Sequence, residues 1–94
     1  MTNYSAEVII VLRDGILDAQ GKAVENSLHS LEFNQLSNVR VGKAIYLTVA
    51  ANDIDEANKM VETATEGLLA NTTVEEYTIQ IRENLLSKTN NPKI

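Results

Sequence analysis

Apolar residues follow one another without a break from Val8 to Leu12, near the start of the chain. An uninterrupted run rich in β-branched residues is typical of a strand that is covered on both faces, so Ala6 to Arg13 predicts a central strand. Two later segments, Ala44 to Ala50 and Val74 to Ile81, alternate apolar with more polar positions and predict two further strands. We therefore expect a sheet with the first strand in its middle.

Two segments between these strands carry apolar residues at helical spacing. The first predicted helix runs from Asp18, which can act as its N-cap, to Phe33, and Asn34 is expected to end it in the left-handed conformation. The second begins after the capping pair Asn52-Asp53 and ends at Asn71. Each helix has an apolar stripe that should face the sheet: Ala23, Val24, Leu28 and Leu31 in the first, and Ile54, Ala57, Val61, Ala64 and Leu68 in the second.

A short segment, Leu36 to Val41, predicts a fourth strand that turns through Gly42-Lys43 into the strand beginning at Ala44. The element order is then β-α-β-β-α-β. This order predicts an α+β, ferredoxin-like domain, in which a four-stranded antiparallel sheet carries both helices on one face and the first and third strands are central neighbours. The domain should comprise residues 1–84, with 85–94 as a polar C-terminal tail.

Such a topology leaves the second face of the sheet uncovered. Because that face would be too apolar to remain in water, we expect a homo-oligomer in which the sheets of two subunits pack against each other. The residues predicted for this oligomer interface are Ile9, Val11, Ala44, Tyr46 and Thr48.

Composition narrows the class of protein. The 94 residues carry a net charge of −5 without any cluster of Lys and Arg, which argues against nucleic-acid binding. The sequence contains no cysteine, so disulfides and thiolate metal sites are excluded. The longest apolar run is far shorter than a membrane-spanning helix, and the first residues do not resemble a signal peptide. The expected location is the cytoplasm, with no membrane or nucleic-acid partner.

No catalytic constellation is recognisable. His29 is the one histidine and has no cysteine or paired carboxylates near it in the sequence, so a packed or surface role is favoured over metal binding or base catalysis. Ser27 and Ser30 lack the glycines of a nucleophile elbow. Arg40-Val41-Gly42-Lys43 could meet an anion at a hairpin tip or could simply be a turn with solvated charges. We therefore expect no catalytic residue, no metal and no cofactor bound by this chain alone.

Four blocks of the sequence together resemble the PurS family, the small subunit of phosphoribosylformylglycinamidine synthase. They are LDAQGKAVENSLHSL from Leu17 to Leu31, VRVGK from Val39 to Lys43, LLANT from Leu68 to Thr72, and VEEY from Val74 to Tyr77. The resemblance covers almost the whole chain, in order and spacing, although the tail after Asn84 lies outside it. The chain also departs from the common pattern of the family at Ala19 and Thr72, where proline or another residue often stands, and Ala44-Ile45-Tyr46 lies in a variable segment.

The resemblance implies a part in purine biosynthesis, in a ligase that forms a carbon–nitrogen bond with glutamine as amido donor. A synthetase subunit (PurL-type) uses ATP and Mg, a glutaminase subunit (PurQ-type) releases ammonia, and the small subunit bridges them without catalytic residues of its own. It also implies a homodimer or a dimer of dimers. The residues expected to contact these partners are the polar ones within the matching blocks: Asp18, Gln20, Lys22, His29, Arg40 and Lys43.

Two other functions fit a ferredoxin-like domain. A small-molecule-sensing regulatory module would need a glycine-containing loop after the first strand, for which Asp14-Gly15 is a weak substitute. An RNA-binding sheet would need aromatic and basic residues on its open face, where Tyr46 stands alone. The regulatory module is the stronger alternative.

Overall fold

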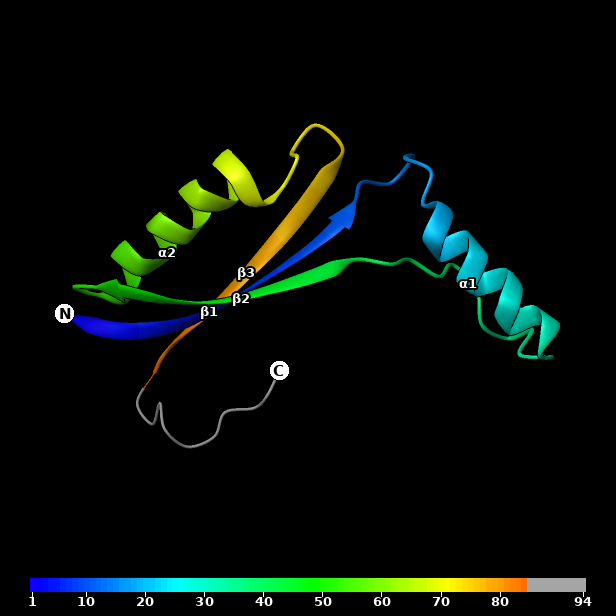
Figure 1. Ribbon diagram of the computed structural model, residues 1–94, viewed down its shortest axis with the longest axis horizontal. Helices are drawn as coiled ribbons and strands as arrows, with labels where there is room; N and C mark the ends of the chain where they lie inside the picture. The colour runs from blue at the N-terminus through cyan, green and yellow to red at the C-terminus, as the bar shows by residue number, and fades with distance from the viewer. Residues whose placement is uncertain (85–94) are drawn as a thin grey trace.

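The computed structural model describes residues 1–84 and contains three strands, two α-helices and one π-helical turn (Figure 1). The predicted tail, residues 85–94, lies outside the described residues. In chain order the elements are β1 (Thr2–Leu12), α1 (Ala19–Ser30), β2 (Lys43–Ala51), α2 (Ile54–Ala64), the π-helix η1 (Thr65–Leu69) and β3 (Glu75–Glu83).

The three strands form one antiparallel sheet in the order β2-β1-β3. Val8 is paired with Ile45 on one side and with Ile79 on the other, and this register continues along most of β1. The predicted position of the first strand in the middle of the sheet is confirmed. Its pairing with the strand that begins near Ala44 is confirmed as well.

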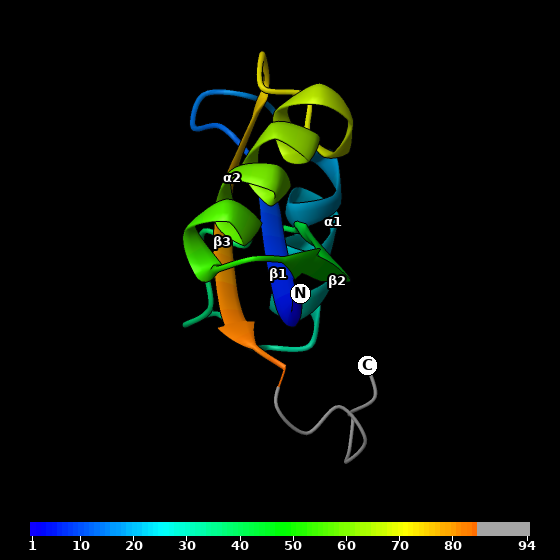
Figure 2. The same cartoon turned by 90° about the vertical axis from the view of Figure 1, so that its left-hand side faces the viewer.

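Helix α2 covers one face of the sheet, and a small apolar core lies between the two (Figure 2). Period-two alternation turns every second residue of β1 toward α2, while Ala57 and Val61, one helical turn apart, point back from the helix. Asp53 caps α2 as predicted, because its side chain accepts a hydrogen bond from the Glu56 N–H at 2.8 Å. The buried apolar residues are Tyr4, Ala6, Val8, Ile10, Val49, Ala51, Ala57, Val61 and Ala70.

The predicted fourth strand is wrong: within residues 1–84 the sheet has three strands, and Leu36–Val41 is irregular. Two of the backbone N–H groups that would have formed its ladder are bound by side chains instead. The Val39 N–H donates to a carboxylate oxygen of Glu25, and the Val41 N–H donates to Asp18. In addition, Asn38 is left-handed, with φ 58°, which interrupts an extended chain.

The prediction that both helices cover one face of the sheet is wrong for α1. Among the described residues, α1 makes no extended contact with any strand or with α2, and it lies beyond the end of the sheet (Figure 1). Its stripe is consequently open to solvent, with Leu31 68% exposed and Val24 43% exposed. What remains of the predicted class is an α+β chain with an antiparallel sheet and two α-helices.

The helix ends also differ from the sequence prediction. Neither Asn34 nor Asn71 is left-handed; Glu32 ends α1 with φ 73°, and the Phe33 N–H donates back to the Leu28 carbonyl at 2.9 Å. At the end of α2 the π-helical turn adds residues to the last turn, so Thr65 is buried while Leu68 is 84% exposed.

Candidate interaction surface

Residues 13–42, here called the arm, connect β1 to β2 and project beyond the sheet (Figure 1). The strands that they join are antiparallel neighbours, with Ile10 opposite Lys43. The arm is therefore a long insertion at the end of a β-hairpin, built from α1 and an irregular return segment. The rest of the described chain, β1 to β3 with α2 and η1, is called the body.

Side-chain acceptors on α1 hold the return segment against the helix. One oxygen of Asp18 caps the helix through the Gly21 N–H at 2.9 Å, as predicted, and the other accepts from the Val41 N–H at 2.8 Å. Hydrogen bonds from Gly21 and then from Val41 lower the pKa of Asp18 below its ordinary 3.8, and nearby Arg40 contributes further. The carboxylate stays charged at neutral pH and joins both ends of the arm.

Two features make this packing close. A Cβ atom at Gly21 would lie 2.4 Å from the Val39 carbonyl oxygen and 2.6 Å from an Asp18 oxygen, so only glycine fits there without displacing the return segment. At the far end of α1, His29 Nε2 lies 2.7 Å from the Leu36 carbonyl oxygen and donates to it. The arm thus has a defined shape although Gly21 is its one buried residue on α1.

Arg40 joins the arm to the body. Its guanidinium donates to the carbonyl of Leu12 at the end of β1, and lies 3.7 Å from the carboxylate of Asp14. On the other side of the hairpin end, Arg13 donates to the Thr72 carbonyl at 2.9 and 3.1 Å. These contacts fix where the arm leaves the sheet.

The predicted partner-contacting residues all lie on the arm or at its base, but they are not equivalent. Gln20 and Lys43 line a hollow of about 390 Å³ at the base of the arm, together with Asp18. Lys22 is exposed on α1. By contrast, Asp18, His29 and Arg40 bind the arm's own backbone or that of β1. Their contact with partner subunits stays a prediction.

The predicted oligomer interface lies on the face of the sheet opposite α2. Ile9 and Val11 are half-buried there, and Tyr46 is 56% exposed. The register adds polar neighbours that the sequence pattern did not reveal, because Glu7 lies between Tyr46 and Gln80 on the same face. Ala44 and Thr48 are exposed. This interface also stays a prediction.

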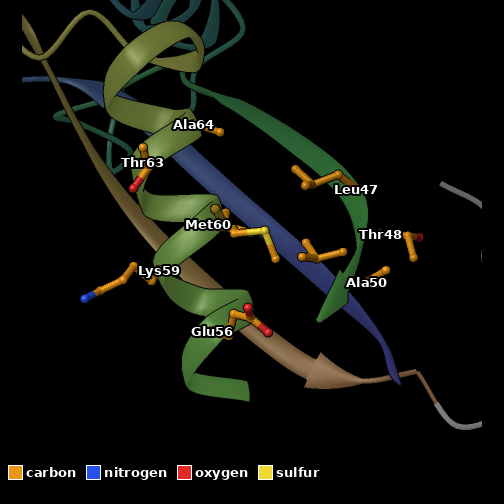
Figure 3. Close-up of a pocket in the computed structure, with 10 residues that line it drawn as sticks. Leu47, Thr48, Ala50, Glu56, Lys59, Met60, Thr63 and Ala64 are labelled. Carbon is orange, nitrogen blue, oxygen red and sulfur yellow. The ribbon is translucent and has the colours of Figure 1, made fainter. Parts of the chain in front are cut away.

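A groove on the α2 side of the sheet is a surface that the sequence did not predict. It has a volume of about 620 Å³, and Met60 of α2 points across it toward Leu47 of β2, while Lys59 points away (Figure 3). The groove exists because α1 does not cover β2. The one signal in the sequence was Met60, an apolar residue just outside the predicted stripe of α2. The apolar residues that line the groove are Leu47, Val49, Met60, Val61 and Ala64.

The described residues offer no constellation for covalent chemistry. No group of three histidine or carboxylate side chains within residues 1–84 is placed to hold a metal ion. The Tyr77 hydroxyl donates to Glu66 at 2.6 Å, and this hydrogen bond raises the pKa of Tyr77 to about 12, far from the range of an acid–base catalyst at neutral pH. No helix in this part of the chain is both long and apolar enough to cross a membrane.

Comparison with known proteins identifies the family. Residues 5–83 match the family model of PurS, described as phosphoribosylformylglycinamidine (FGAM) synthase. The PurS subunit of Bacillus subtilis phosphoribosylformylglycinamidine synthase is 39% identical over 80 residues, which cover 85% of this chain and 94% of that protein.

Solved structures agree. The structure of B. subtilis PurS aligns with a TM-score of 0.75, covering 85% of this chain and 99% of that one. A chain in the structure of PurLQS from Thermotoga maritima aligns with a TM-score of 0.78 at 31% identity, covering 88% of this chain and 99% of that one. From the family model and these relatives, which match nearly end to end, it follows that the chain belongs to the PurS family of phosphoribosylformylglycinamidine synthase subunits.

Proposed function

We propose that this chain is the non-catalytic bridging subunit of an ATP- and glutamine-dependent phosphoribosylformylglycinamidine synthase. The complex would convert formylglycinamide ribonucleotide to its amidine in purine biosynthesis, in the cytoplasm. The observation that carries the proposal is membership of the PurS family, together with the PurLQS complex in which a similar chain occurs. The synthetase and glutaminase subunits would supply the sites for ATP, Mg and glutamine.

The role of such a subunit follows from the chemistry of ammonia. Ammonia released into water is protonated and diluted, and ammonium is not a nucleophile. Holding the glutaminase beside the synthetase raises the effective concentration of ammonia at the activated amide. A subunit that acts in this way needs rigid contact surfaces and no reactive side chains.

The arm is the surface best suited to reach a second protein. It projects from the body, and its shape is fixed by the hydrogen bonds of Asp18, Glu25 and His29. We infer that Lys22 and Lys43, with Gln20, contact the partner subunits directly. Asp18, His29 and Arg40 would act by holding these residues in place.

Reconstitution tests the proposal. The chain is mixed with matching synthetase and glutaminase subunits, and product formation is compared with glutamine and with an ammonium salt as nitrogen source. If glutamine-dependent synthesis requires the chain while ammonium-dependent synthesis does not, it is the bridging subunit. If adding the chain changes neither the glutamine-dependent nor the ammonium-dependent rate, the bridging role is wrong. A thermal-shift screen with amino acids and nucleotides should then test the regulatory alternative.

Charge reversal on the arm tests the contact residues. Lys22→Glu with Lys43→Glu should lower the glutamine-dependent rate at limiting concentration of the chain and leave the ammonium-dependent rate unchanged. Lys59→Glu is the matched control, because Lys59 carries the same charge on α2, outside the arm. An equal loss from both variants would remove Lys22 and Lys43 from the interface.

The subunit would act as a homodimer or a dimer of dimers. The proposed contact is the open face of the sheet, through Ile9, Val11, Ala44, Tyr46 and Thr48. Tyr46 is the largest exposed apolar side chain in this set and therefore the best position for a test.

A further inference from the structure

The junction between the arm and the body is narrow. Among the described residues, α1 makes no extended contact with any strand or with α2. Within residues 1–84, the only hydrogen bond from residues 14–41 to the body is donated by the Arg40 guanidinium, and its acceptor is the Leu12 carbonyl. Two structural units joined by a small polar contact move relative to each other unless a large apolar interface holds them. The orientation of the arm therefore depends on very few groups.

Each unit is nevertheless firm in itself. The body is held by the apolar residues buried between the sheet and α2. In the arm, Asp18 accepts from the Val41 N–H at 2.8 Å, and Glu25 accepts from the Val39 N–H at 3.2 Å. These bonds lie within the arm, so they persist when its orientation changes. Motion is thereby confined to the two places where the chain passes between arm and body.

The first of these places is a loosely packed turn. Residues 13–16 are exposed, and the Ile16 N–H donates to the Arg13 carbonyl at 3.1 Å. Gly15 has φ 90°, and a Cβ atom at this position would meet no atom within 4 Å. Since nothing packs against this turn, it can follow a movement of the arm without breaking contacts in the body.

The second place, at Gly42, is closely packed against β1. A Cβ atom at Gly42 would lie 2.6 Å from the Ile10 carbonyl oxygen and 2.7 Å from a side-chain carbon of Val11. The backbone of the return segment therefore touches β1 at one point, with no side chain between them. Hinges are usually formed by a few residues at the ends of elements, often small ones. Gly42, immediately before β2, has the properties of a pivot.

Space for a movement lies beside this pivot. The hollow of about 390 Å³ at the base of the arm is lined from both units. Ala19 and Gln20 belong to the arm, whereas Leu12 and Glu75 belong to the body. Rigid joints inside proteins are close-packed, with few voids larger than a water molecule. The hollow thus leaves room for the arm to change its angle to the sheet.

We propose that the arm turns as one rigid unit about Gly42, and that Arg40 holds the observed orientation through its bond to the Leu12 carbonyl. Arg40 also lies 3.7 Å from the carboxylate of Asp14 in the exposed turn, so it joins both crossings of the chain. The functional consequence rests on the proposed function. Lys22 and Lys43 lie on opposite sides of the pivot, and turning the arm would change the spacing of these two proposed partner contacts.

Distances between spin labels test the movement, since the chain contains no cysteine. Asn26→Cys places one label on the arm. Lys59→Cys places the other on α2, where the side chain points away from the groove (Figure 3). The labelled chain is refolded with excess unlabelled wild type, so that each assembly carries one labelled chain. Asn26 lies about 12 Å along α1 from Asp18, so a turn of about 20° moves it by up to about 4 Å, a shift that pulsed electron paramagnetic resonance resolves.

Removal of the guanidinium should free the arm. Arg40→Met should broaden the distance distribution between the two labels, or shift it by up to about 4 Å. Arg82→Met is the matched control, because it removes the same group from β3 near the other end of the sheet, and it should reproduce the wild-type distribution. Identical distributions for Arg40→Met and Arg82→Met would refute the proposal.

A label pair within the arm separates turning from unfolding. The distance between labels at Lys22→Cys and Asn34→Cys should be the same in the wild type and in the Arg40→Met variant. If this distance broadens as much as the distance to α2, the arm loses its structure instead of turning as a unit, and the proposal is wrong.

Gly42→Ala tests the position of the pivot. The added Cβ must displace the return segment from β1, so the distance between arm and α2 should change while the distance within the arm does not. An unchanged distance to α2 would refute the role of Gly42. All these distances are measured without partner subunits, so a negative result would leave the glutamine-dependent reconstitution unaffected. A failed reconstitution would in turn remove the bridging role and leave the hinge standing.

Discussion

The body and the arm are held together by different forces. In the body, nine apolar residues are buried between the sheet and α2, and the strands are paired along most of their length. In the arm, α1 buries only Gly21. The arm is held together instead by side-chain hydrogen bonds: Asp18 and Glu25 accept from backbone N–H groups, and His29 donates to a backbone carbonyl. The body is therefore stable through burial, while the arm has a fixed shape and a free apolar stripe, a combination suited to binding.

The largest expected difference between the two regions is in core stability. Ile10→Ala removes a side chain that is 1% exposed at the centre of the body, and this should lower the free energy of unfolding by about 2–5 kcal/mol. Asn26→Ala on the solvent side of α1 should change it by less than about 0.5 kcal/mol. Urea denaturation at one protein concentration measures both. Similar losses would mean that the arm has a core of its own.

A pair of glycine variants tests the close packing of the arm. Gly21→Ala places a Cβ 2.4 Å from the Val39 carbonyl and should destabilise the arm by about 1–3 kcal/mol. Gly67→Ala in the π-helical turn meets no atom within 4 Å and should be neutral or stabilise the body by up to about 1 kcal/mol. Hydrogen exchange of the α1 amides is the measurement. Unchanged exchange in the Gly21→Ala variant would contradict the packing argument.

Acid should act first on the arm. The pKa of Asp18 is lowered in the folded arm, so its charged form contributes stability above its unfolded pKa of 3.8. That contribution is lost as the pH falls through the lower, folded value. Hydrogen exchange of α1 should therefore accelerate, relative to β1, between neutral pH and pH values below 3.8, after correction for intrinsic exchange rates. Asp18→Ala should show fast exchange of α1 already at neutral pH, and slow exchange in that variant would contradict the role of the carboxylate.

High pH should destabilise the body, and this is the smallest of the four effects predicted for the two regions. The pKa of Tyr77 is raised from its usual 10 to about 12 by its hydrogen bond to Glu66. A raised pKa stabilises the fold while the hydroxyl is neutral, so this contribution is complete below pH 10 and is lost as the pH rises toward 12. Tyr77→Phe should remove this dependence. Phenolate absorbance, measured against pH, follows the titration, and an ordinary midpoint near 10 for Tyr77 would contradict the assignment.

The elements of the body could be predicted from the sequence because its pattern and its packing agree. The apolar run at Val8 to Leu12 marks the central strand, and Asp53 marks the start of α2. The exception is the π-helical turn, which exposes Leu68 although its spacing from Ala64 continues the helical stripe. The extra residue of a single π-helical turn cannot be recognised from the spacing of apolar residues in the sequence.

The arm could be predicted only in part. Asp18 was recognisable as a helix cap, but its second bond, to Val41, joins residues far apart in the chain and has no local signal. Leu36 to Val41 has the apolar content of a strand, yet two of its N–H groups, those of Val39 and Val41, donate to the carboxylates of Glu25 and Asp18. The apolar spacing of α1 predicts a stripe, but periodicity does not say what covers it. In the described residues this stripe is open to solvent, with Leu31 68% exposed.

The bond between Asp18 and Val41 also has a consequence for folding kinetics. β1 and β2 must find their register across the whole arm, and closing a long flexible loop is entropically unfavourable. A carboxylate that joins the start of α1 to the end of the return segment shortens the effective loop to a few residues at each side. We expect the arm to form before β1 pairs with β2. The segment that buries the least surface would then increase the rate at which the sheet forms.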